Sequence, residues 1–294
     1  MALNHTAKPL KSCVIIGGGI AGSAIARVLS ERGVETTLLE KSGQLTSGAT
    51  WHAAGLVTRF AGSSKVKKVH VRALNLLIDL HNEHDIGLHL PGSIRLIEKN
   101  NEGRLYEAKQ HVAMATLFDD EEFPTKMIDI DEIKEKHPLV NTDNIECAIW
   151  TPSDGDIDPT SLTNCVAKLA RQHGTKIKFN QEVNDIERTS KNGTNTFTIK
   201  TTTGEIYETE SVINAAGLWS RGVSNMMDPN IAHPAFVIEH QYAITDTMPE
   251  IVEYKKKVPK GVPVLRDLAG SSYIRQEGNG MLIGEYIIEW STVD

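Results

Sequence analysis

The stretch CVIIGGGIAG, residues 13–22, decides the fold of this chain. An apolar strand runs directly into a Gly-x-Gly-x-x-Gly sequence, after which a helix is predicted from Ile20 to Glu31. In such a sequence the first glycine permits a tight turn, the second lets the backbone approach a pyrophosphate, and the third lets the helix pack closely on the sheet. The free N–H groups of the helix N-terminus then face the phosphates. The stretch therefore predicts a dinucleotide site.

A carboxylate in the next strand completes this pattern. Glu40 follows a second apolar strand predicted over residues 35–39, and it lies 40 − 22 = 18 residues after Gly22. A carboxylate near this distance accepts hydrogen bonds from the adenosine ribose. Strand, helix and acidic residue together predict a β-α-β dinucleotide-binding unit, without distinguishing NAD from FAD.

A second informative stretch, SGATWHAAG at residues 47–55, surrounds a histidine with small residues. A neutral imidazole nitrogen is a competent nucleophile toward the 8-methyl carbon of a flavin ring, and small neighbours would not crowd that edge of the ring. Position alone favours a simpler interpretation, in which His52 is a hydrogen-bonded histidine of a buried loop.

Segments spread over nearly the whole chain resemble one enzyme family. They are LEK (39–41), TWHAAGL (50–56), PGSIRL (91–96), DGDIDP (154–159), VINAAGLW (212–219), EHQY (239–242), VLRD (264–267) and YIRQE (273–277). With them the chain resembles the flavin-dependent amine oxidoreductases of the glycine oxidase and sarcosine oxidase type, and most closely the dimethylglycine and sarcosine dehydrogenases. The TWHAAG and HQY segments are the most specific of these matches.

The resemblance implies an α/β fold with a Rossmann-like FAD-binding domain of the glutathione-reductase type and a mainly antiparallel β-sheet substrate domain. We expect the FAD-binding domain at residues 1–90 and 145–230, and the substrate domain at 91–144 and 231–294. Family members continue for several hundred residues, and residues 286–294 match them less well than the preceding ones. We therefore expect a chain truncated at its C-terminus, with an incomplete substrate domain.

The resemblance also implies the cofactor and its contacts. Because Trp51-His52 matches the covalent attachment motif of the family, we expect FAD bound covalently through His52. The predicted cofactor-binding residues are Gly17, Gly19, Ile20, Ala21, Gly22, Glu40, Lys41, Gly48, Ala49, Thr50, Trp51, His52, Ala53, Ala54, Gly55, Leu56, Val183 and Trp219.

The family reaction is the oxidative N-demethylation of a small methylated amino acid, dimethylglycine or sarcosine. A hydride leaves the N-methyl carbon for flavin N5, and the iminium is hydrolysed to formaldehyde. The resemblance places His240 and Tyr273 in the catalytic site, whereas Arg266 and Arg275 remain alternative partners for the substrate carboxylate. The electron acceptor would be an electron-transfer flavoprotein or oxygen, and tetrahydrofolate would bind only to a longer form.

Two other functions stay open. A non-catalytic regulatory subunit of similar architecture would have no use for His52, and neither would an oxidase with non-covalent FAD. The chain could also be an inactive fragment of the longer enzyme.

Composition excludes several other classes of protein. The net charge of −7 leaves no basic footprint for nucleic acid, and no apolar run approaches the length of a membrane span. His81, His84 and His89 lack the thiolate or carboxylate neighbours of a metal site, so we expect no metal. Three cysteines far apart in sequence, among apolar residues, indicate reduced and buried packing residues, which predicts a cytoplasmic protein, or a mitochondrial one if a targeting segment is missing from this chain. They are Cys13, Cys147 and Cys165.

Overall fold

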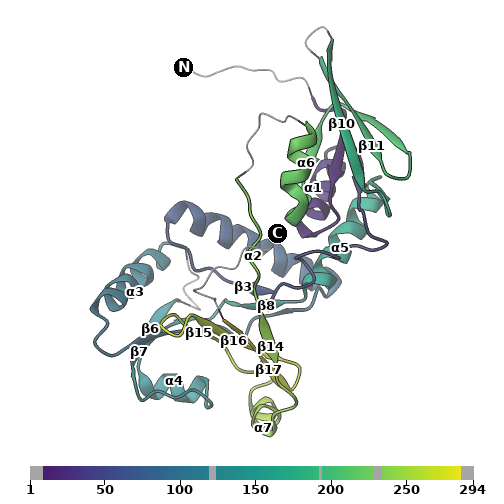
Figure 1. The fold of residues 1–294 in the computed structure, drawn as a ribbon. Coiled ribbons are helices and arrows are strands. Elements are labelled where there is room, and N and C mark those ends of the chain that lie inside the picture. The colour runs from purple at the N-terminus through teal and green to yellow at the C-terminus, as the bar shows by residue number, and fades with distance from the viewer. Residues whose placement is uncertain (1–8, 119–123, 192–193, 228–233, 286–294) are drawn as a thin grey trace, which may run out of the picture. The chain divides into compact units, whose positions relative to one another are not determined.

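The computed structural model describes residues 9–118, 124–191, 194–227 and 234–285, and it divides into two compact units (Figure 1). Unit 1 comprises residues 1–53 and 159–237, and unit 2 comprises residues 54–158 and 238–294. Both units combine helices with sheets, which confirms the predicted α/β class.

Unit 1 is built on a four-stranded parallel sheet in the order β13-β1-β2-β9. Its strands are β1 (Ser12–Ile16), β2 (Glu35–Leu39), β9 (Lys176–Lys178) and β13 (Val212–Asn214). Two helices, α1 (Ile20–Glu31) and α5 (Pro159–Gln172), cover one face of this sheet. Successive side chains of a strand point to opposite faces, so Cys13 and Ile15 pack against these helices while Val14 and Ile16 face the other layer.

That other layer is a three-stranded antiparallel sheet with a short helix. Its elements are β10 (Val183–Lys191), β11 (Thr194–Thr201), β12 (Ile206–Thr209), the 3-10 turn η1 (Gly217–Trp219) and α6 (Ser220–Met227). Ile186, Ile199 and Val223 close the second core of unit 1. The parallel sheet is therefore buried on both faces, as parallel sheets normally are.

Unit 2 contains a seven-stranded mixed sheet in the order β14-β17-β16-β15-β5-β7-β6, in which only the β15–β5 pair is parallel. Its strands are β5 (Ser93–Glu98), β6 (Lys126–Ile128), β7 (Ile145–Thr151), β14 (Tyr242–Ile244), β15 (Val264–Asp267), β16 (Ser272–Glu277) and β17 (Gly280–Glu285). Helices α4 (Ile130–Lys136) and α7 (Pro249–Lys257) pack on one face, and α3 (Glu102–Ala115) packs on the other face over β5 and β7.

A smaller sheet completes unit 2. Its strands are β3 (Leu56–Val57), β4 (Leu88–His89) and β8 (Gly155–Ile157), and the chain between β3 and β4 forms helix α2 (Ser64–His84). Both β3 and β4 pair with β8. The unit boundaries consequently differ from the predicted ones, because these pairings and the β5–β7 pair put residues 54–90 and 145–158 into unit 2.

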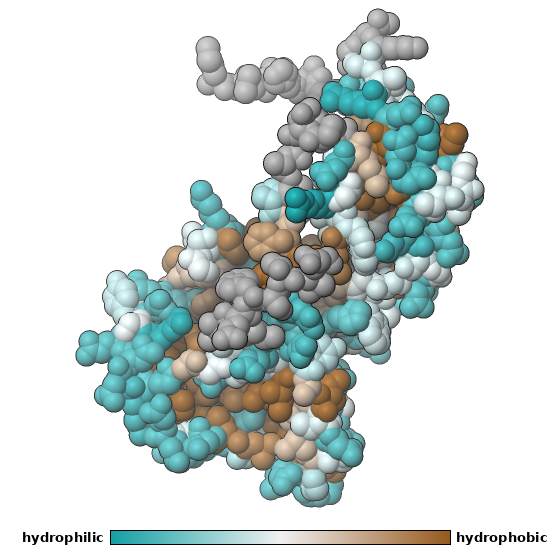
Figure 2. Space-filling model, viewed as in Figure 1, coloured by the Kyte–Doolittle hydropathy of each residue, from teal (hydrophilic) through white to brown (hydrophobic). Residues whose placement is uncertain are grey.

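The sequence also predicts a strand over residues 93–98, a strand-like run over residues 236–245 and a short helix capped by Asp131. The first of these predictions agrees with β5, and the other two are corrected. The strand-like run 236–245 forms a strand only at Tyr242–Ile244, since β17 pairs with these three residues alone, while Phe236 is 74% exposed. The helix near residue 130 begins earlier than its predicted cap, because Asp129 and not Asp131 accepts the N–H of Glu132. Apolar side chains remain exposed at the β14 edge, and Figure 2 shows them over this part of the sheet.

A buried histidine makes unit 2 sensitive to acid. His137 ends α4, is 2% exposed, and neither of its ring nitrogens finds a hydrogen-bond partner among the described residues. Burial lowers the pKa of His137 from 6.5 to about 4, because the charged ring would lose its water. Between these two values the unfolded chain binds a proton that the folded chain does not. Stability present above pH 6.5 is therefore lost as the pH falls toward 4, by about 3 kcal/mol.

We expect His137→Leu to remove this part of the acid sensitivity, because leucine does not titrate. Urea unfolding at pH 7 and pH 4.5 would measure it: the difference in unfolding free energy between the two pH values should be smaller in the variant than in the unmutated chain. An equal difference in both proteins would contradict the assignment to His137.

Candidate active site

The glycine-rich loop of unit 1 connects β1 to α1, and two of its glycines have no room for a Cβ atom. Gly17 has φ +115°, and a Cβ at this position would lie 2.3 Å from the carbonyl oxygen of Ala215. A Cβ at Gly22 would lie 2.0 Å from the carbonyl oxygen of Gly17. Both positions therefore require glycine, one for its backbone conformation and the approach of the chain after β13, the other for the packing of α1. This brings the N-terminus of α1 to the end of the sheet.

Glu40 lies beside this loop and is 7% exposed. Its Oε2 accepts the N–H of Gly18 at 2.7 Å, and its Oε1 accepts the N–H of Ser42 at 2.8 Å. These bonds fix the orientation of the carboxylate, while each oxygen keeps a second acceptor position. A ribose hydroxyl is a suitable donor for such an acceptor.

The loop, Glu40 and the end of β13 enclose a cavity of about 660 Å³ in unit 1. This volume is typical of small-molecule and cofactor sites. The ammonium group of Lys41 lies 3.3 Å from the ring centroid of Trp219 and contributes a cation–π pair to its wall. The lining residues are Ile16–Ala21, Leu39–Ser42, Ser47–Thr50, Gln181–Val183, Ala215–Trp219, Gly222, Val223 and Met226.

The structure divides the predicted cofactor residues into three groups. Those that line the cavity are Gly17, Gly19, Ile20, Ala21, Glu40, Lys41, Gly48, Ala49, Thr50, Val183 and Trp219. Those that lie in unit 1 but do not line it are Gly22, Trp51, His52 and Ala53. Ala54, Gly55 and Leu56 belong to unit 2.

Several lining residues escaped the sequence prediction. Gln181 and Glu182 follow β9 and carry no motif, although the backbone N–H of Gln181 donates to the carbonyl oxygen of Glu40 at 2.9 Å. The small residues Ala215 and Ala216 do give a signal, because they follow an apolar strand, as Gly17 does. Met226 of α6 gives none, since only packing brings this helix to the cavity.

The residues present fit the dinucleotide part of FAD. Thr50 Oγ1 accepts the N–H of Ile20 at the start of α1 with a 3.2 Å contact, and a Cβ at Gly19 would lie 2.9 Å from the same oxygen. Backbone N–H groups at a helix start bind phosphate, and the Glu40 carboxylate at the end of β2 suits a ribose. The loop, Thr50 and Glu40 would hold the pyrophosphate and the adenosine.

His52 is exposed at the end of the loop that leaves the cavity. Its Nδ1 lies 3.1 Å from the carbonyl oxygen of Gly48, and its ring meets the Trp51 ring edge-on at 4.9 Å between centroids. A carbonyl oxygen can only accept, so in a neutral imidazole this contact places the proton on Nδ1 and leaves the lone pair on Nε2. The ring is thus exposed, unlike the buried loop histidine of the simpler interpretation.

In unit 2, Tyr273 belongs to a row of side chains that crosses four strands on one face of the large sheet. The register aligns Arg266 of β15 with Tyr273 of β16, Tyr273 with Gly284 of β17, and Gly284 with Tyr242 of β14. Because a Cβ at Gly284 would lie 2.1 Å from Tyr273 Cζ, the tyrosine ring lies across β17 over this glycine. Tyr273 is 5% exposed, and His240 is an exposed residue two positions before Tyr242.

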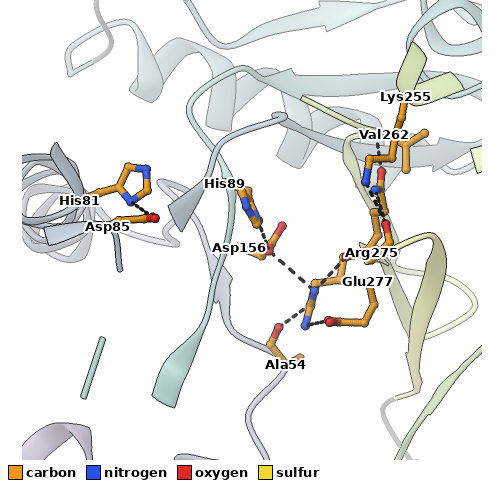
Figure 3. A network of polar contacts seen from close by, with 11 residues as sticks. Ala54, His81, Asp85, His89, Asp156, Lys255, Val262, Arg275 and Glu277 are labelled. Atoms are coloured by element: carbon orange, nitrogen blue, oxygen red, sulfur yellow. Dashed lines mark hydrogen bonds and ion pairs between the residues drawn. The ribbon is translucent and has the colours of Figure 1, made fainter. Parts of the chain in front are cut away.

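The two candidate arginines have different surroundings. Arg266 is half-buried, and its guanidinium lies 5.9 Å from the centroid of the Tyr273 ring. Arg275 lies on the same face of β16 as Tyr273, as regular alternation requires, but Ala54, Asp156 and neighbouring groups of unit 2 surround its guanidinium (Figure 3).

Two of the histidines considered as metal ligands lie beside carboxylates instead. Nδ1 of His81 lies 3.5 Å from Oδ1 of Asp85, and Nδ1 of His89 lies 3.4 Å from Oδ1 of Asp156. Across the described ranges, no group of three or more His, Cys, Asp or Glu side chains is arranged to hold a metal.

Of the three free cysteines only Cys13 is buried, and burial raises the pKa of its thiol to about 11. Cys147 and Cys165 are half-buried, contrary to expectation. No helix in the described part of the chain is long and apolar enough to cross a membrane.

Comparison with known proteins decides the family. A family model described as FAD dependent oxidoreductase matches residues 12–293. The chain belongs to this family. Mitochondrial dimethylglycine dehydrogenase of Rattus norvegicus is 37% identical to this FAD-dependent oxidoreductase over 275 residues, which are 93% of this chain and 30% of the rat protein.

A bacterial relative and a solved structure agree with this assignment. The 4-methylaminobutanoate oxidase (formaldehyde-forming) of Paenarthrobacter nicotinovorans is 32% identical, over 93% of this chain and 31% of that protein. The crystal structure of L-proline dehydrogenase from P. horikoshii matches with a TM-score of 0.80 and 28% identity, over 94% of this chain and 70% of that one. The chain thus spans roughly 30% of the length of the two relatives.

Proposed function

We propose that this FAD-dependent oxidoreductase takes part in the oxidative N-demethylation of a small N-methylated amino acid, dimethylglycine or sarcosine. The observation that carries the proposal is the geometry of His52, whose Nδ1 is bound to the carbonyl of Gly48 at the cavity, so that Nε2 is available to bind FAD covalently. Both relatives support the reaction class, because one is named for dimethylglycine and the other for the formation of formaldehyde.

FAD, once bound, would supply the two-electron acceptor for a hydride that leaves the N-methyl carbon. The chain itself would supply placement. The glycine-rich loop and Glu40 would hold the adenosine and pyrophosphate, and His52 would fix the other end of the cofactor. Water then adds to the substrate iminium, and the adduct breaks down to formaldehyde and the demethylated amine.

The row on the large sheet of unit 2 supports a substrate role for Tyr273, and the HQY segment that matches the family supports one for His240. Amine oxidation requires an unprotonated nitrogen, whose lone pair assists the departing hydride. An imidazole can accept the ammonium proton near neutral pH, and the hydroxyl of a buried tyrosine can orient the substrate by a hydrogen bond. Arg266, beside Tyr273, provides a cation for the substrate carboxylate.

The partners follow from the proposed reaction. The electrons would pass to an electron-transfer flavoprotein or to oxygen, and tetrahydrofolate would bind only to a longer form of the protein. The rat relative is named as mitochondrial, and the compartment of this chain stays a prediction.

Turnover on methylated amines tests the proposal. We expect the FAD-loaded chain to release formaldehyde from dimethylglycine or sarcosine with an artificial electron acceptor, and the unmethylated amine glycine to release none. Repeating the assay with oxygen as the only acceptor distinguishes an oxidase from a dehydrogenase. Binding of FAD without formaldehyde from either amine would contradict the proposed reaction and favour a regulatory or inactive chain.

A further inference from the structure

Arg275 has several polar contacts on the face of the large sheet that also carries Tyr273. It is 9% exposed, and its Nε–H donates to the carbonyl oxygen of Ala54 at 2.7 Å. Nη1 donates to the carbonyl oxygen of Gln276 at 2.9 Å, and Nη2 lies 2.6 Å from Oε2 of Glu277 (Figure 3). The N–H donors of the planar guanidinium are thus directed at three different acceptors of the chain.

The charges around Arg275 disfavour the binding of a third carboxylate. Asp156 Oδ1 lies 3.7 Å from Nη1, so two carboxylates of the chain, those of Asp156 and Glu277, already face one guanidinium. Burial raises the pKa of Asp156, and the positive charge of Arg275 is the main influence that opposes this rise. A substrate carboxylate here would meet like charges in a partly desolvated place. This removes Arg275 from the two alternatives for substrate binding.

Arg275 binds the segment that follows the loop containing His52. Ala54 is the second residue after His52, and the next residues are paired as well: the carbonyl oxygen of Gly55 accepts the N–H of Ile157 at 2.9 Å, and Leu56 pairs with Asp156. Residues 55–57 are thus held by β8, and Arg275 extends this anchorage by one residue toward His52. From a fixed Ala54, the chain reaches His52 within about 7 Å.

We propose that Arg275 is a positioning residue for His52, so that its bond to Ala54 restrains the loop in which the covalent bond to FAD forms. The inference rests on the proposed attachment at His52. Attachment would form a bond between imidazole Nε2 and the 8-methyl carbon of the flavin and would break one C–H bond of that methyl group. The electron pair of the broken bond would reduce the flavin ring, which would take up the released protons, and dissolved oxygen would then reoxidise the ring. The step requires the imidazole nitrogen and the methyl carbon to be held close together, and small displacements of a reacting group cost large factors in rate. Loss of the Ala54 contact lets the segment before β3 sample more conformations, and the attachment then slows.

The test separates the geometry of Arg275 from its charge. Arg275→Lys keeps a cation opposite Asp156 and Glu277 but loses the planar fork, whereas Arg275→Met loses both. Glu277→Gln retains the bond to Ala54, and Arg104→Met removes an exposed arginine of α3 as a matched control. The purified chains are incubated with FAD, and the acid-stable flavin is measured over time together with the rapidly bound, acid-labile FAD.

We expect attachment in Arg275→Lys and Arg275→Met to slow by about tenfold to a hundredfold, with non-covalent FAD affinity within about threefold of the unmutated chain. Glu277→Gln and Arg104→Met should attach FAD at nearly the unmutated rate. If Arg275 had a general structural role, its replacement would weaken covalent attachment and non-covalent FAD binding together, and that result would overturn the inference. Equal attachment rates in all variants would also overturn it. An unmutated chain without acid-stable flavin would refute the attachment at His52 itself, and the inference with it.

Discussion

Replacing His52 with alanine is expected to abolish covalent flavin binding while leaving the cavity intact. The unmutated chain should retain its yellow colour in the pellet after acid precipitation, whereas His52→Ala should release the flavin to the supernatant. The reason is chemical, since alanine has no nucleophilic atom to replace imidazole Nε2. The cavity itself is lined by other residues, so non-covalent FAD should still bind to the variant before precipitation.

The matched control is His173→Ala, which removes another exposed histidine of unit 1. Flavin absorbance of pellet and supernatant measures the covalent fraction, and mass spectrometry of the peptide that contains residues 47–57 locates the bond. Colour that leaves the unmutated chain on precipitation, or that stays with His52→Ala, would show that His52 is not the attachment residue.

Changing His240 or Tyr273 is expected to slow flavin reduction by the substrate by about tenfold to a thousandfold, the usual cost of losing one acid–base or orienting contact. Tyr273→Phe removes only the hydroxyl and keeps the ring that packs over Gly284. His240→Asn removes the titratable ring from an exposed position. Neither change touches His52, so the covalent flavin should remain.

Anaerobic mixing with dimethylglycine or sarcosine, followed by the loss of flavin absorbance, measures the reduction rate directly. Tyr106→Phe serves as the control, because this tyrosine of α3 is 66% exposed. Unchanged reduction in both His240→Asn and Tyr273→Phe would move the catalytic assignment to other residues. A slower reduction accompanied by loss of bound flavin would indicate a structural role instead.

The sequence was sufficient for features that depend on neighbouring residues. The helix Ile20–Glu31 and the strands Glu35–Leu39 and Ser93–Glu98 have the predicted bounds, because apolar periodicity and glycine punctuation are local signals. The predicted pairing of the glycine-rich loop with a carboxylate is also observed, since Glu40 accepts the N–H of Gly18. Each of these features depends on a few neighbouring residues or, for Glu40, on contacts within one β-α-β unit.

The unit boundaries could not be predicted from such local signals. Residues 54–57 continue a segment whose sequence resembles a flavin-binding loop, yet β3 pairs with β8, about a hundred positions later in the chain. The cap of α4 was misplaced for a different reason: Asp129 and Asp131 are both good cap residues, and only the backbone conformation selects the first.

By itself the sequence determined the dinucleotide-binding unit and the identity of the candidate residues, because strand, turn and helix preferences act over a few neighbouring residues. Only the tertiary structure decided which groups the two arginines contact. Arg266 and Arg275 are equivalent as residue types, but strand register places one beside Tyr273 and the other against Ala54, Asp156 and Glu277. The physical reason is that such contacts join residues up to 275 − 54 = 221 positions apart, and sheet order and register alone bring them together.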